Sequence, residues 1–347
     1  MEKIEPYTNP YLCGHHEAEE LFLRAWKAGT LHNSLMITGP EGVGKATLAY
    51  RMARFLLAAD EENKDAYTTL ELPESNTAFR LVANRSHPNL KIIERDFIEN
   101  DKKKIIKAIK DGEALSDDEV QNLKKSAVIK VDEIRTINEF LGKKSFNGSW
   151  RIVIVDSVDD MNIASANAIL KILEEPPAKS MLLLISHNPN RLLPTIRSRC
   201  AKINLQPLTQ DEVASLLRRY NPALTEAEVK GLAEISSGSI GNALRYSEYG
   251  GLNKYKLLES LFYAREQYNL TDALQFCDEA ARDEDAWNLA VELIKHFVAE
   301  NMKGGEKVEE ISNAWNKITA MVNEVASLNM DKKQVMYNII TAICGAM

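Results

Sequence analysis

The sequence has little cysteine, and no two cysteines are close enough along the chain to share a zinc ion. Its four cysteines, Cys13, Cys200, Cys277 and Cys344, are spread over 347 residues. This spacing gives neither a zinc ribbon nor a readable disulfide framework, and isolated reduced cysteines are typical of the cytoplasm. We therefore expect a cytoplasmic protein that holds no zinc and no other metal.

Long apolar runs and a positive net charge are also missing. No stretch approaches 18 uninterrupted apolar residues, and the first residues contain no apolar core of signal-peptide length, so we expect no membrane contact. The formal net charge is −7. A chain with this charge does not bind nucleic acid over its whole surface, and any DNA contact has to be local or made within an assembly.

One glycine-rich segment, GPEGVGKATLA, has the spacing of a phosphate-binding loop, with Gly39, Gly42, Gly44 and Lys45 in the matching positions. An apolar strand at residues 34–37 precedes it, and a helix with an apolar face follows. In that setting the backbone N–H groups at the helix start face the phosphates, and the lysine supplies positive charge. We interpret the segment as a nucleotide loop, and a chance glycine-rich turn is the weaker alternative.

The residues that should hold magnesium and activate water are absent from the pattern. Ala46 stands where the loop pattern requires Ser or Thr, and Thr47 lies one helical step further, which turns its side chain by about 100°. Asp156, at the end of an apolar run, can orient a metal ion. Ser157 follows it and cannot act as a base. The pattern predicts a nucleotide site that has kept its shape and lost its catalytic residues.

Hydrophobic patterning predicts a parallel α/β sheet in the first part of the chain. Apolar strands are expected at 34–37, 87–95, 152–155 and 182–185, and helices at 17–29, 45–59, 131–141 and 163–174. Alternation of this kind places the ligand site at the carboxyl ends of the strands. We interpret Asp159 and Asp160 as a solvated helix start.

Two further regions have a different character. Residues 60–130 are polar and irregular, and the lysine cluster 102–104 is interpreted as a solvated face in preference to a DNA contact. After Leu205 the pattern is helical to the end of the chain. Two capping boxes there, at Thr209 and Thr225, each have a glutamate three residues later.

Four motifs in order resemble a known family. NAILKILEEPP, LLPTIRSRC and GSIGNALR, behind GPEGVGKATLA, are similar to the AAA+ subunits of bacterial DNA polymerase III clamp loaders, and most of all to delta-prime subunits. The resemblance covers most of residues 14–247. It implies a RecA-like AAA+ P-loop domain with a parallel sheet at 1–206, a small helical lid at 207–252 and an all-helical collar for oligomerisation at 253–347.

The same resemblance implies partners. Gamma/tau and delta subunits would complete a hetero-pentameric ring within the DNA polymerase III holoenzyme, a DNA-directed DNA polymerase and nucleotidyltransferase. The sliding clamp and primed DNA would be reached through that assembly. Such a subunit acts in DNA replication, during loading of the clamp onto primed DNA.

The resemblance also implies a role for the motif Ser198-Arg199-Cys200. In the family its arginine enters the neighbouring subunit's ATP site and stabilises charge on the γ-phosphate, so Arg199 is expected to be catalytic in trans. The residues alone indicate a solvated loop arginine and a small core cysteine. Gly241 stands where motor subunits carry the lid arginine that senses phosphate.

Three departures from an active motor subunit, at Ala46, Ser157 and Gly241, argue against intrinsic ATP hydrolysis. We expect a non-hydrolysing stator that needs no cofactor and has room for weak residual binding of ATP or ADP. The alternatives are an active AAA+ motor subunit and a branch-migration-type helicase. The degenerate nucleotide site is assigned to Gly39, Gly42, Gly44, Lys45, Thr47 and Asp156.

Overall fold

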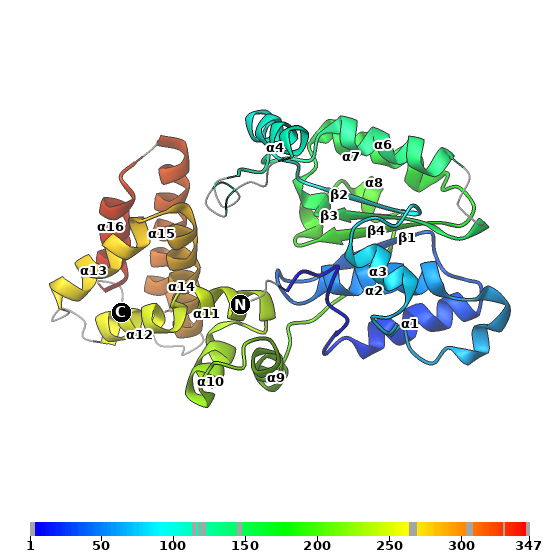
Figure 1. Cartoon of the computed structure of the whole chain (residues 1–347). Helices are drawn as coiled ribbons and strands as arrows, with labels where there is room; N and C mark the ends of the chain where they lie inside the picture. Colours follow the sequence, from blue (N-terminus) through cyan, green and yellow to red (C-terminus); the bar gives the residue numbers. More distant parts are fainter. Residues whose placement is uncertain are drawn as a thin grey trace. The chain divides into compact units, whose positions relative to one another are not determined.

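The computed structural model describes residues 4–112, 116, 119, 123–143, 148–263, 269–302, 308–328 and 330–344. The chain forms two compact units, Met1–Pro207 and Leu208–Met347. The first is an α/β unit and the second consists of helices, as Figure 1 shows. The predicted α/β class is confirmed, because the first unit contains a five-stranded, all-parallel sheet.

The sheet has the strand order β2-β3-β4-β1-β5. Its strands are β1 (Ser34–Thr38), β2 (Leu90–Glu94), β3 (Arg151–Asp156), β4 (Ser180–Ser186) and β5 (Ala201–Asn204). All residues of β1 and β4 are buried, as expected for parallel strands covered on both faces. Four strands match the predicted ones. The short β5 has no predicted counterpart, since only Ile203 of its four residues is buried.

Helices pack on both faces of the sheet and form two apolar cores. One core contains Leu35 and Ile37 with α1 (His16–Lys27) and α2 (Lys45–Ala58). The other contains Met36 with α6 (Val131–Gly142) and α7 (Ile163–Glu174). Alternate residues of β1 therefore point to opposite cores. The predicted α7 matches the observed helix from its first residue to its last.

The region 60–130 contains more structure than its polar composition predicts. It holds a 3₁₀ helix η1 (Glu61–Ala66), α3 (Thr77–Ala83), β2 and α4 (Glu99–Asp111). The lysine cluster on α4 is not simply solvated. Lys102 pairs with Asp96, and Lys104 lies 3.4 Å from the buried Asp101. The side chain of Lys104 is 69% exposed, so the interpretation as a solvated face fits it, whereas Lys102, at 29%, is partly covered.

The second unit is built entirely of helices among its described residues. They are α9 (Gln210–Tyr220), α10 (Glu226–Ile235), α11 (Ile240–Glu248), α12 (Gly251–Tyr263), α13 (Leu270–Ala281), α14 (Glu284–Met302), α15 (Val308–Leu328) and α16 (Lys332–Cys344). Both predicted capping boxes, at Thr209 and Thr225, are present. The division into lid and collar stays a prediction. In the part of the chain described, no helix is both long and apolar enough to span a bilayer.

Candidate nucleotide loop and arginine site

The glycine-rich loop joins β1 to α2 and uses backbone conformations that favour glycine. Gly39, Gly42 and Gly44 have φ angles of 141°, 73° and 107°. A Cβ atom on Gly39 would lie 2.5 Å from the carbonyl oxygen of Leu205, so this position also lacks room for a side chain. The loop thus has the glycine-dependent shape that the sequence pattern predicts.

Lys45, the first residue of α2, is folded back into the loop. Its side chain is buried, and Nζ donates hydrogen bonds to the carbonyl oxygens of Gly39, at 2.7 Å, and of Pro40. Burial lowers the pKa of Lys45 to about 8, although the charges of Glu41 and Asp156 act in the opposite direction. The amine is therefore held by the loop's own carbonyl groups, at the position expected for a phosphate contact.

The N-terminal segment, residues 5–15, covers one side of the loop. The ring Nε2 of the buried His15 lies 2.7 Å from the carbonyl oxygen of Val43, and Leu12 packs within 3.5 Å of where a Cβ on Gly44 would be. The spacing of the motif predicted neither contact, because both residues precede it.

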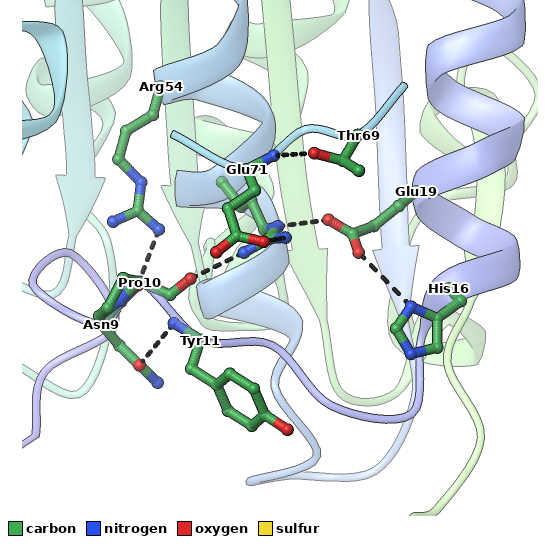
Figure 2. Close-up of polar contacts among 9 residues, drawn as sticks. Asn9, Pro10, Tyr11, His16, Glu19, Arg54, Thr69 and Glu71 are labelled. Atoms are coloured by element: carbon green, nitrogen blue, oxygen red, sulfur yellow. Dashed lines mark hydrogen bonds and ion pairs between the residues drawn. The ribbon is translucent and has the colours of Figure 1, made fainter. Parts of the chain in front are cut away.

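Two arginines of α2 hold the N-terminal segment in place. Arg51 donates to the carbonyl oxygen of Pro10 at 2.7 Å, and Arg54 donates to that of Asn9 at 2.8 Å. Figure 2 shows the contact of Arg54 with Asn9. Arg51 also pairs with Glu19. The path of residues 9 and 10 is thus fixed by charged donors on the helix that starts at the loop.

On the metal side of the candidate site, Asp156 is kept while the hydroxyl that usually holds magnesium is replaced. Ala46 and Thr47 lie in the first turn of α2, so the alanine methyl group occupies the position of the usual hydroxyl. Asp156 ends β3, close enough to interact with Lys45, and burial raises the pKa of its carboxyl group. Ser157 follows it. The loop backbone fits phosphate groups, whereas this donor set does not fit a Mg²⁺-bound nucleotide.

Asp159 has a structural role that the sequence did not reveal. Its carboxylate accepts hydrogen bonds from Ser157 Oγ at 2.7 Å, Ser186 Oγ at 2.9 Å and the backbone N–H of His187 at 2.6 Å. Burial opposes ionisation, but these hydrogen bonds lower the pKa of Asp159. Asp160 pairs with Arg95 at 3.1 Å. Both residues lie in the first turn of the 3₁₀ helix η3 (Val158–Asp160), so the predicted helix start is confirmed. The prediction that Asp159 is solvated is wrong, because its carboxylate ties the end of β3 to the end of β4.

Arg199 lies at the amino ends of the strands, whereas the loop lies at their carboxyl ends. Arg199 precedes β5, whose first residue, Ala201, pairs with Leu35 near the start of β1, whereas Lys45 follows the end of β1. Its Nη2 lies 2.7 Å from Oε1 of Glu174, and Nη1 donates to the carbonyl oxygen of Thr195 at 3.0 Å. The side chain is 35% exposed.

Cys200, the residue after Arg199, is buried and anchors this segment of the chain in the core. It belongs to the apolar core between the sheet and α6 and α7, and burial raises the pKa of its thiol to about 12. A thiol with this pKa is unreactive at neutral pH. The core cysteine expected from the sequence is thus found, next to an arginine that is paired with Glu174 and is not simply solvated.

Gly241 lies in the second compact unit, as the second residue of α11. The residues assigned to the nucleotide site, Gly39 through Thr47 with Asp156, all lie in the first unit. No cluster of three or more His, Cys, Asp or Glu side chains suited to a metal ion occurs in the described ranges.

Comparison with known proteins agrees with these features. The family model described as DNA polymerase III, delta subunit, matches residues 14–209. The chain belongs to this family. DNA polymerase III subunit delta′ of Pseudomonas aeruginosa is 29% identical over 212 residues, which are 61% of this chain and 54% of that protein. The Escherichia coli subunit delta′ is 27% identical over 225 residues, covering 65% and 57%.

The chain spans about half the length of these curated relatives. Among solved structures, a DNA polymerase III gamma subunit-related protein of Thermotoga maritima superposes with a TM-score of 0.45 at 18% identity. The superposition covers 93% of this chain and 99% of that one.

Proposed function

We propose that this chain is a clamp-loader subunit of the DNA polymerase III holoenzyme that hydrolyses no ATP itself and donates Arg199 to a neighbouring ATPase subunit. Its partners are gamma/tau and delta subunits in a five-membered ring, which opens the sliding clamp and closes it on primed DNA. Membership of the delta-subunit family and the relatives named delta′ support this role.

The placement of Arg199 carries the proposal. Arg199 lies at the amino end of β1 and the loop starts at its carboxyl end. The five residues of β1 span about 16 Å at roughly 3.3 Å each. A phosphate in the chain's own loop is therefore out of reach of Arg199. A trans-acting arginine acts on a site in another molecule, and the placement of Arg199 meets this requirement.

The loop supports the non-hydrolysing part of the proposal. Its lysine is bound to loop carbonyl groups, the metal-binding hydroxyl is replaced by Ala46, and Ser157 offers no base. Because the cradle is mostly backbone, it retains weak affinity for ATP or ADP with little dependence on magnesium. These substitutions argue against the alternatives of an active motor subunit or a branch-migration-type helicase.

The test is ATP turnover and nucleotide binding by the purified chain, each measured with and without magnesium. We expect no magnesium-dependent turnover, and binding at most weak and little affected by chelation. The matched variant is Lys45→Ala. Turnover that needs magnesium and disappears in this variant would show an active motor subunit and overturn the proposal.

A further inference from the structure

The guanidinium of Arg199 is held at two points within the part of the chain described. Glu174, the last residue of α7, contacts Nη2 at 2.7 Å, and the carbonyl oxygen of Thr195 accepts from Nη1 at 3.0 Å. The two contacts come from different elements, since Thr195 belongs to α8 (Pro194–Arg197). Together they fix the plane of the guanidinium.

The remaining donors of this guanidinium face no described partner. A guanidinium carries five N–H groups, and the two contacts use one on each terminal nitrogen. The side chain lies at an open groove of about 640 Å³ lined by loop 29–33 together with Leu173, Glu174 and Pro176. The groove leaves room beside the arginine for an incoming anionic group, and the free N–H groups can bind two oxygens at once.

We propose that Glu174 is a positioning residue for Arg199: it holds the guanidinium in the orientation in which a neighbouring subunit's γ-phosphate meets it. This inference rests on the proposed arginine-donor function. Arginine loses much side-chain freedom when it is ordered, and a group ordered before the reaction does not lose that freedom during it. Glu174 thus acts on the rate through Arg199 and touches no substrate.

A purely structural role does not explain the pair. Both side chains are partly exposed, at 35% for Arg199 and 50% for Glu174, and exposed ion pairs contribute little to folding stability. Cys200 already anchors this segment in the core. Removing the carboxylate should therefore leave the fold and ring assembly intact and change only the orientation of the guanidinium.

The experiment is the DNA- and clamp-stimulated ATPase of the reconstituted loader, with kcat and KM for ATP measured separately at matched assembly. Glu174→Ala should lower kcat by roughly three- to tenfold and leave KM unchanged, because the geometry of the transition state is affected and ATP binding is not. Glu174→Gln keeps a hydrogen-bond acceptor and should retain more activity. Glu175→Ala, a change of the exposed neighbouring glutamate, is the matched control and should behave as wild type.

The double variant Glu174→Ala/Arg199→Ala should be no slower than Arg199→Ala alone, since a positioning residue has no effect without its partner. Additive losses would overturn the proposal. So would a wild-type or faster rate for Glu174→Ala beside an impaired Arg199→Ala, and that result would leave the arginine-donor function standing. A wild-type rate for Arg199→Ala would overturn both.

Discussion

Burial and hydrogen bonding together decide the state of the ionisable groups around the loop. Lys45 is 3% exposed, and two carbonyl oxygens replace the water that an ammonium group normally binds. Asp159, in contrast, accepts enough hydrogen bonds to remain ionised in spite of its burial. Residue types at fixed spacing predicted neither environment: the acceptors of Lys45 are backbone carbonyl groups of its own loop, and two donors to Asp159 come from the end of β4.

The first prediction concerns the pH dependence of folding through Lys45. Its pKa is about 8 in the folded chain and 10.5 when it is unperturbed, so the unfolded chain binds more protons between these values. The free energy of unfolding of wild type should therefore rise from pH 8 to pH 10.5 relative to Lys45→Met, by at most about 3 kcal/mol.

This difference is measured by chemical denaturation of both proteins across that pH range. Groups that titrate alike in the two proteins cancel in the comparison. Lys202→Met, a change of an exposed lysine on β5, serves as the control and should run parallel to wild type. Parallel curves for wild type and Lys45→Met would contradict the account of a buried ammonium group.

Individual elements show what the sequence could predict and why the rest was missed. Long apolar runs gave β1, β3 and β4, and the helix at 163–174 was predicted with its observed ends. The 3₁₀ helix η1 and the helices α3 and α4 were missed because their sequences are polar, short or both. The Glu174–Arg199 pair was also missed, since its partners are 25 residues apart and meet only when α7 and α8 pack side by side.

The loop's shape depends on a glycine at one close approach to Leu205, the residue that follows β5. Gly39→Ala would bring a methyl group within 2.5 Å of the Leu205 carbonyl oxygen at a φ of 141°, where residues other than glycine are strained. We expect a loss of about 3 kcal/mol in the free energy of unfolding. Denaturation midpoints of the full chain measure this loss.

Gly29→Ala provides the matched control, because Gly29 also has a positive φ, of 68°, but nothing lies within 4 Å of an added Cβ. Gly29→Ala should lower the free energy of unfolding by about 1 kcal/mol, from backbone strain alone. Equal losses in the two variants would mean that the contact with Leu205 contributes nothing.

At the scale of the whole molecule, the two ends of the parallel sheet carry different groups. The carboxyl ends of the strands carry the glycine-rich loop, with Ala46 in place of the usual hydroxyl, and the amino ends carry a partly exposed arginine held by Glu174 and Thr195. The sequence singled out both places, the loop from a motif and Arg199 from a family resemblance, and the roles assigned to them stay predictions. The length of β1 separates Arg199 from the chain's own loop, and the proposed function therefore assigns its effect to a neighbouring subunit's site.

The most direct measurement is therefore the DNA- and clamp-stimulated ATPase of the reconstituted loader carrying Arg199→Ala, compared with wild type at matched assembly. The rate should fall by roughly 10³-fold or more, as for other trans-acting arginines, while this chain's fold and its entry into the ring are unchanged. Arg199→Lys should restore only part of the rate, because lysine cannot bridge two phosphate oxygens in the same way. An unchanged rate in Arg199→Ala would show that this arginine serves no neighbouring site.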